Sequence, residues 1–432
     1  MLETISRIFT HRDLRKKIIY TILLLLLFRV LAHVPLPGVD LIKLKQFFAT
    51  NQVFGLLDLF SGGTLSNFSV VLMGVGPYIT ASIVIQLLTM VIPSLEALSK
   101  EGEWGRQRIN YYTRILTVPL AFIEGFGMLQ LLQKGTQSNI VSQMTPFQIV
   151  VFLFTVVAGT VLLMWLGELI SENGIGNGVS LIISLGILSG FPNQIQRTFS
   201  LIAGGAVIDW SKALGFIIFL LLTAAAVALI VFINEAQRNI PIAYARRIRG
   251  SASYGGVESH LPLKVNMAGV IPIIFALSLM VFPGVIANIF KMARSAWLSN
   301  ASTFVANLFQ SNNLFYGIFY FILVVLFTYF YTYVIFHPKE VAENLQKQGA
   351  FIPGIRPGPN TANYLSHVSN RILIAGAIFL GLIAVLPFIV QAITKINTIV
   401  LGGTGLLIVV SVVLETYRQI QSQLIMRTYD DY

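Results

Sequence analysis

Ten apolar stretches, most of them close to the length that crosses a bilayer, take up most of this chain of 432 residues. A transmembrane helix needs about 20 mostly apolar residues, because it rises about 1.5 Å per residue across a hydrocarbon core of about 30 Å. With 55% hydrophobic and 11% charged residues, the chain has too little polar surface to fold in water. We therefore expect an all-α integral membrane protein with ten transmembrane helices. The expected spans are residues 18–33, 68–92, 115–132, 147–167, 179–190, 214–233, 265–286, 314–336, 372–390 and 402–415, of which the fifth and tenth are short and must extend or tilt.

Two sequence patterns each occur twice, at matching places in the two halves of the chain. The pattern GVxPxIxA begins at Gly74 and again at Gly269, and a weaker pattern, GxxLxI, begins at Gly178 and at Gly403. A proline beside a glycine in corresponding spans is typical of duplicated membrane proteins whose working site lies between the halves. We expect halves 1–199 and 200–432 with five spans each, so the second half is inverted relative to the first around a central pore.

The basic residues are distributed unequally across the expected membrane. Alternating the ten spans places twenty Lys and Arg residues on the side that holds both termini and eight on the other side, with Arg29 inside a span. Cytoplasmic loops carry the excess of basic residues in membrane proteins. The basic residues behind the formal net charge of +11 therefore indicate how the chain is oriented in the membrane, and we expect both termini in the cytoplasm. The basic N-terminal run precedes a long apolar segment without a cleavage pattern, so we interpret it as leading into the first span.

Two kinds of segment lie outside the spans. Residues 53–67 are too apolar for an external loop and too short to cross, and Gly62 and Gly63 interrupt them, which favours a short re-entrant helix in the outer mouth of a pore. The alternative is an amphipathic turn on the membrane surface. Loops 237–264 and 337–371 are long and, in the second, rich in Pro and Gly, so we expect both to project into the cytoplasm. Their arginines could bind lipid phosphate, carboxylates or RNA phosphate.

Several kinds of chemistry have no signature in this chain. It has no cysteine, no phosphate-binding loop, no HExxH and no GxSxG, so we expect no enzyme, metal site or cofactor. The glycine run 174–178 has no preceding strand and no following lysine, and we expect it to let the fifth helix begin close against a neighbour. Glu124 is the acidic residue clearly in mid-span, which is thin support for ion coupling; a structural hydrogen-bonding role is equally compatible. An intramembrane enzyme would need a nucleophile and a base at depth, which the spans do not supply.

The expected centre is lined by branched aliphatic residues. Val75 and Ile79 share a helical face with Ile83, Val179 and Ile183 share another, and Ile274 and Ile408 occupy the repeat-related places. A ring of such side chains excludes water and ions by dewetting. The simpler alternative is that they pack against another helix or lipid.

Long motifs along the chain resemble the SecY family of bacterial protein-conducting channels. The resemblance runs from about residue 14 to residue 424, in order. It rests on PLPG (35–38), LFSGGTLS (59–66), GPYITASIVIQLL (76–88), KEGEWGRQRINYYTR (100–114), GIGNGVSLII (174–183), HLPLKVNMAGVIP (260–272) and GAFIPGIRPG (349–358).

The resemblance implies a function and a set of partners. Members of this family pass unfolded secretory proteins across the bacterial plasma membrane and release transmembrane segments laterally into lipid. The implied partners are the SecA ATPase or a translating ribosome through its rRNA, the small subunits SecE and SecG, the preprotein with its signal peptide, and membrane lipids. The runner-up is a small-solute secondary transporter with inverted repeats, which would need a polar pocket at the midplane.

The resemblance also implies roles for particular residues. The pore ring would comprise Val75, Ile79, Val179, Ile183, Ile274 and Ile408. The plug, residues 56–67, would include Leu56, Leu57, Leu59, Phe60, Ser61, Gly62 and Gly63. A lateral gate between the second and seventh spans would carry a polar cluster of Thr80, Glu124 and Asn266, although a charged Glu124 departs from the merely polar residue expected there. Arg246, Arg247, Arg249 and Arg356 would dock the motor or the ribosome.

Overall fold

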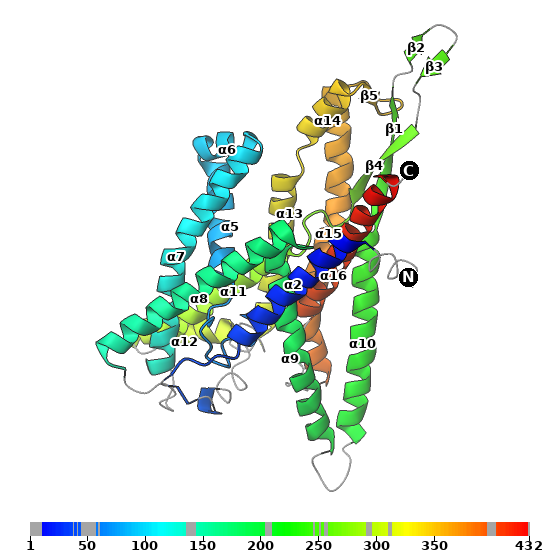
Figure 1. Cartoon of the computed structure of the whole chain (residues 1–432). Coiled ribbons are helices and arrows are strands. Elements are labelled where there is room, and N and C mark those ends of the chain that lie inside the picture. The colour runs from blue at the N-terminus through cyan, green and yellow to red at the C-terminus, as the bar shows by residue number, and fades with distance from the viewer. Residues whose placement is uncertain are drawn as a thin grey trace.

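The computed structural model shows a predominantly helical protein with a small β-structure at one end (Figure 1). It describes residues 11–37, 39–40, 42–44, 58, 61–134, 144–203, 210–244, 247–249, 252–254, 258–290, 296–309, 313–394 and 403–430. The helices in the first half are α2 (Arg12–Leu31), α5 (Gly76–Val91), α6 (Pro93–Lys100), α7 (Glu103–Lys134), α8 (Pro146–Asn173) and α9 (Gly178–Ala203). Those in the second half are α10 (Trp210–Glu235), α11 (Ile271–Phe290), α12 (Ala296–Leu308), α13 (Leu314–Ile335), α14 (Pro338–Lys347), α15 (Pro359–Thr394) and α16 (Gly403–Asp430).

Several of these helices have the length and composition of membrane spans. Among the described residues, four helical segments meet both criteria: α8, Leu214–Glu235 of α10, Leu314–Lys347, and Pro359–Leu386 of α15. Helices α5 and α6 together form a fifth candidate that bends by 103°. Gly178–Pro192 and Ile271–Met280 are shorter apolar segments. The fifth and tenth expected spans do extend, because α9 and α16 continue well beyond their apolar parts.

Both repeated patterns mark the beginnings of helices. Gly74 and Gly269 each have positive φ, +57° and +66°, and α5 and α11 each begin two residues later with proline as their second residue. Proline suits the first helical turn because the amide it lacks has no intrahelical partner there. The weaker pattern likewise begins α9 at Gly178 and α16 at Gly403. The two halves thus start corresponding helices in the same way.

The expectation of a continuous second span over residues 68–92 was wrong. Residues 62–75 form turns instead, and the helix begins only at Gly76. The left-handed backbone at Gly74 and at Phe68 explains this, since neither conformation continues a right-handed helix through the apolar run. Pro93 then ends α5 and begins α6, which produces the bend.

The all-α expectation also needs correction at one end of the molecule. Strands β1 (Gln237–Tyr244) and β4 (Glu258–Lys264) form an antiparallel ribbon, β2 (Arg247–Arg249) pairs with β3 (Ala252–Tyr254), and β5 (Ala350–Phe351) adds to β1. The sheet order is β4-β1-β5. The second projecting loop, expected over residues 337–371, is shorter than expected, because α14 fills its start and α15 begins at Pro359 instead of near residue 372.

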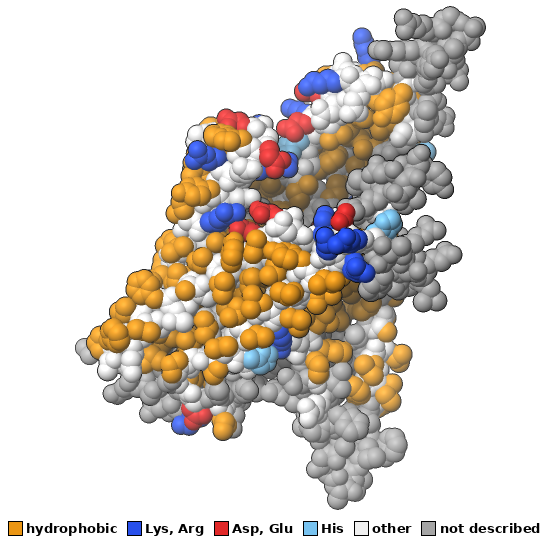
Figure 2. Space-filling view, viewed as in Figure 1, with side chains coloured by type: hydrophobic (Ala, Val, Ile, Leu, Met, Phe, Trp, Pro, Cys, Tyr) orange, Lys and Arg blue, Asp and Glu red, His pale blue; other side chains and the backbone are white. Residues whose placement is uncertain are grey.

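The main apolar core lies where helices of both halves meet. One cluster contains buried side chains from α2, α8, α9, α11, α13, α15 and α16, together with Val75 just before α5. On the face shown in Figure 2, hydrophobic side chains cover a broad middle band, and most of the charged side chains lie along its upper edge. Such a band suits the hydrocarbon region of a bilayer. The strands, α6 and α14 lie beyond it at the upper end (Figure 1).

Candidate functional site

The six aliphatic residues expected to form a ring come together in the main core cluster. Val75, Ile183 and Ile408 are buried within it, with Ile408 fully inaccessible. Ile79, Val179 and Ile274 are partly buried and pack against the same cluster. The six residues belong to four segments, namely the start of α5, α9, α11 and α16. Ile83 does not join them; it packs in a different cluster with Phe275 and Tyr331.

Glycine contacts fix where α9 carries Val179 and Ile183. A Cβ on Gly178 would lie 2.0 Å from the carbonyl oxygen of Gly167 on α8, which no side chain could occupy. The turn before α9 is held from two other helices: Thr21 of α2 accepts from the Ile175 amide at 3.1 Å, and Gln419 of α16 accepts from the Gly176 amide. The expectation that the glycine run allows a close helix start is confirmed.

The expected plug lies only partly within the described structure. Leu56, Leu57, Leu59 and Phe60 fall outside the described residues. Ser61, Gly62 and Gly63 belong to a compact turn that contacts α2 and α9. Ser61 approaches the backbone just before Val75, since a Cβ on Gly74 would lie 3.2 Å from the Ser61 Cα.

The expected gate cluster divides into two separate polar groups. Thr80 of α5 lies beside Glu124 of α7, while the Thr80 hydroxyl donates to the carbonyl of Gly76 at 3.2 Å. Asn266 instead donates to Asn234 of α10 at 2.8 Å, and Asn234 donates to Ser411 of α16 at 2.7 Å. The Asn266 oxygen accepts from the Gly269 amide at 2.9 Å, which shapes the turn before α11. Within the described residues, no hydrogen bond joins Asn266 to either partner expected for it.

A contact that the sequence did not reveal joins α5 to α13. Gln86 of α5 lies close to Tyr331 of α13, beside the rings of Phe275 and Phe327, and the buried Gln86 side-chain oxygen has no hydrogen-bond partner among the described residues. Phe275 of α11 meets Phe327 and Tyr331 edge-on, with ring centroids 6.0 and 5.8 Å apart. Such edge-to-face pairs suit the aromatic quadrupole. Phe275, Phe327 and Tyr331 therefore form an aromatic seam between α11 and α13, and Ile83 of α5 packs against it.

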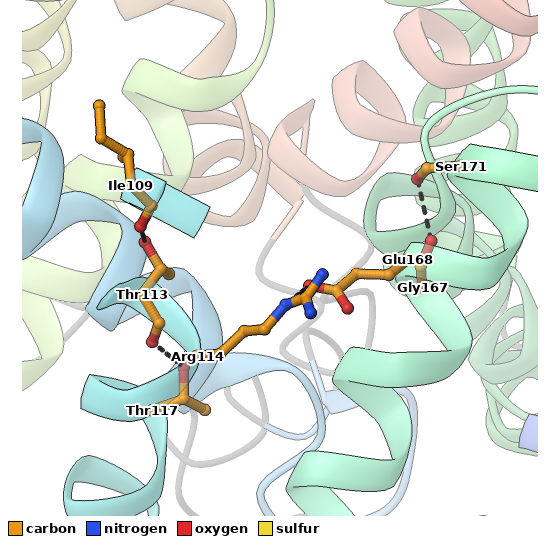
Figure 3. Close-up of polar contacts among 7 residues, drawn as sticks. All are labelled: Ile109, Thr113, Arg114, Thr117, Gly167, Glu168 and Ser171. Carbon is orange, nitrogen blue, oxygen red and sulfur yellow. Dashed lines mark hydrogen bonds and ion pairs between the residues drawn. The ribbon is translucent and has the colours of Figure 1, made fainter. Parts of the chain in front are cut away.

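An ion pair, also absent from the sequence analysis, links α7 to α8 (Figure 3). Arg114 extends from α7 toward Glu168 on α8, and its Nε lies 2.8 Å from the Glu168 carboxylate. Glu168 is mostly buried, with its side chain 16% exposed. On α7, the hydroxyls of Thr113 and Thr117 each donate to the carbonyl one turn earlier, so the polar groups beside the pair are satisfied locally.

The two projecting loops form one continuous surface. Strand β5 of the second loop pairs with β1 of the first through Ala243 and Phe351, and the exposed Arg356 follows in the next turn. Beneath it, Ile352 is buried against Ile240 and Leu263 of the ribbon. The structure describes the backbone of Arg247 and Arg249, while Arg246 lies outside the described residues.

Charged residues cluster where the ribbon joins the helices. Arg418 of α16 lies 2.7 Å from the carboxylate of Glu235 and donates to the carbonyl of Asn234 at 2.9 Å. Burial lowers the pKa of the Lys264 amine at the end of β4, and nearby Arg418 lowers it further, while two glutamates act in the opposite direction. The foot of the ribbon is thus tied electrostatically to α10 and α16.

Comparison with known proteins assigns the fold and the family. The SecY family profile matches residues 69–417. The protein translocase subunit SecY of Streptomyces galbus is 42% identical over 447 residues, covering 100% of both chains. Two solved structures, one described as a protein-conducting channel and the other as Sec61 in a canine ribosome-channel complex from the endoplasmic reticulum, each share 18% identity. Each covers 94% of this chain and 91% of its own, with TM-scores of 0.63 and 0.62. This chain belongs to the SecY family.

Proposed function

We propose that this protein is the pore-forming subunit of a bacterial protein translocase. It passes unfolded secretory proteins across the plasma membrane and releases transmembrane segments laterally into lipid. The observation that carries the proposal is the gathering of six aliphatic side chains from four segments of both halves into one apolar cluster. A flexible aliphatic constriction can exclude water and ions yet offers a passing chain no hydrogen bonds to hold it. The alternative of a solute transporter would need polar side chains converging at the midplane, and the described residues of the aliphatic cluster are apolar.

The architecture proposed for this function has ten spans in two inverted halves, 1–199 and 200–432. The matched starts of α5 and α11, and of α9 and α16, support the duplication. Residues 56–67 would form a plug beside the aliphatic cluster. The ribbon and α6 and α14 would face the cytoplasm together with both termini, since the N-terminal end of α2 packs against the C-terminal part of α16 through Leu14 and Leu424.

The lateral gate in this proposal is the seam between α5 on one side and α11 and α13 on the other. Gln86 and Tyr331 would face each other across the seam, and the aromatic side chains around Phe275 would fill it. A signal peptide that binds only the parted form shifts the equilibrium toward that form. Thr80 and Glu124 lie on the α5 side, and Asn266 positions the start of α11.

The driving force would come from a partner, since the family forms channels and the chain carries no nucleotide-binding motif. We infer that the surface formed by the ribbon and the Arg356 turn docks the SecA ATPase or a ribosome, and that SecE and SecG bind within the membrane. Arg246, Arg247 and Arg249 would contact rRNA phosphates or SecA carboxylates. Phosphate contacts weaken steeply with salt, so a salt titration of binding separates the two docking modes.

Reconstitution tests the proposal directly. The purified chain, with its small subunits, is placed in proteoliposomes with SecA, ATP and a labelled secretory preprotein. We expect the preprotein to become protected from added protease only when ATP and SecA are present. An Arg356→Ala variant should lower this transport without lowering thermal stability, because Arg356 is exposed. Solute flux without any motor, and no protected preprotein, would instead support a transporter.

A further inference from the structure

Arg29 is the only lysine or arginine within the ten expected spans, and it points at the backbone of the plug turn. It lies in the last turn of α2, and its guanidinium donates to the carbonyl oxygen of Gly62 at 3.1 Å. A cation at this place is favoured by the helix dipole, but a long side chain would ordinarily extend to the membrane surface. Arg29 instead makes a contact with a segment 33 residues away.

Gly62 sits in a socket that leaves no room for a side chain. Its φ of +84° is in the left-handed region. A Cβ on Gly62 would lie 3.0 Å from both the Phe28 ring of α2 and the Cα of Gly186 on α9. A Cβ on Gly186 would lie 2.4 Å from the Cα of Gly62. The turn therefore lies between the Phe28 ring of α2 and the backbone of α9 at Gly186.

The turn held in this socket is a compact unit. The Gly63 amide donates to the Asp58 carbonyl at 2.8 Å, and the Ser66 amide donates to the Asp58 carboxylate at 2.8 Å. The Thr64 hydroxyl lies 3.1 Å from the carbonyl of Leu72, three residues before Val75 of the aliphatic cluster. The two hydrogen bonds to Asp58 hold the turn together, whereas Leu65 and Phe68 anchor its far end in a second apolar cluster, so leaving the socket would be a local displacement around Gly62. The bond to Arg29 would then be broken.

We propose that Arg29 is a positioning residue that latches the plug turn in its socket on α9 and thereby sets the balance between the sealed and open channel. The proposal rests on the proposed function, since it describes how that channel is kept closed. The socket around Gly62 and the six-residue aliphatic cluster are mechanically linked, because Gly186 of the socket lies about one helical turn beyond Ile183 of the cluster on α9. The net contribution of one charge-assisted hydrogen bond changes the ratio of the sealed to the open channel by roughly ten- to a hundredfold. Released from Arg29, the turn leaves the socket more often.

Two variants test the latch from opposite sides of the turn, each with a matched control. Arg29→Met removes the donor and keeps an unbranched apolar side chain; Lys43→Met, in the exposed helical turn after Asp40, is its control. Gly186→Ala introduces a Cβ into the socket; Gly127→Ala is its control, because a Cβ there meets nothing within 4 Å. All four are made in the full chain with its membrane partners.

The chain has no cysteine, so a single Ser61→Cys substitution reports directly on the turn. We expect Arg29→Met and Gly186→Ala each to raise the labelling rate of that cysteine by an impermeant thiol reagent, and the resting ion conductance of proteoliposomes, at least tenfold. The controls should change neither. If Arg29→Met does not yield a monodisperse protein, the Gly186→Ala pair decides the question alone.

Two outcomes would overturn the latch while leaving the channel intact. One is that the parent chain translocates preprotein, while the Arg29→Met and Gly186→Ala variants have the same thiol-labelling rate and the same resting ion conductance as the parent. The other is an increase that the Lys43→Met and Gly127→Ala controls reproduce. A parent chain that translocates nothing would reject the proposed function itself, so the two failures are distinguishable.

Discussion

Replacing Ile408 with asparagine should open the resting channel. Ile408 is fully inaccessible inside the cluster where the helices of both halves meet. Removing its apolar side chain from that cluster loses about 1.5–3 kcal/mol of burial, and an unpaired amide there costs about 1–3 kcal/mol more. In a parted, water-filled pore the amide is hydrated, so most of this penalty falls on the closed form.

If the net difference between closed and open forms is about 3 kcal/mol, the open fraction rises by roughly a hundredfold. The assay is the resting ion conductance of proteoliposomes that contain the channel without preprotein or motor. Ile274→Asn should give a smaller increase, because Ile274 is only partly buried against the same cluster.

Val413→Asn is the matched control. It lies on the same helix but is 56% exposed, so it faces the same surroundings in both forms and should not change conductance. Equal conductance of Ile408→Asn and the parent would refute the reasoning, as would an equal increase in Val413→Asn.

The remaining predictions concern contacts around the cluster. Gly178→Ala should destabilise the protein by about 1–3 kcal/mol or prevent its folding, since its Cβ meets the Gly167 carbonyl, whereas Gly127→Ala should be neutral in a thermal melt. Replacing Asn234 and Asn266 with Ala, singly and together, should show a coupling energy between the two residues of about 0.5–2 kcal/mol in unfolding measurements. Strictly additive losses of stability would contradict the observed hydrogen bond. The Arg114 to Glu168 pair should contribute only about 0.5–1 kcal/mol in a cycle of Arg114→Met and Glu168→Gln, because Arg114 is 44% exposed, and a loss well above that would show a larger role.

Local sequence signals predicted much of the fold correctly because they act over one helical turn. The glycine and proline patterns locate the starts of α5, α11, α9 and α16, and the glycine run before Gly178 predicts a close helix contact. The six aliphatic residues belong to one apolar cluster, whereas their arrangement as a pore ring stays a prediction. The prediction that the second span begins at residue 68 was wrong, because the backbone conformation at Gly74 outweighs the hydrophobicity of residues 68–75.

Contacts between distant segments were beyond such signals. Asn266 has the same amide whether it faces Thr80 or Asn234, and only the relative placement of α10, α11 and α16 selects the partner. The same holds for Gln86 with Tyr331 and for Arg114 with Glu168, each of which joins two helices. The pairing of β5 with β1 depends on how α14 and α15 bring the second loop against the first. No pattern within either segment encodes these choices.

The most direct test is to locate a polypeptide in transit. A photo-crosslinking residue is placed in turn at Val75, Ile79, Val179, Ile183, Ile274 and Ile408, and at the outward-facing Val413, in channels that hold a preprotein stalled midway. We predict crosslinks from all six cluster positions to the same short stretch of the stalled chain and none from Val413. Crosslinks that appear at Val413 but are missing from the cluster positions would contradict the claim that the chain passes between the two halves.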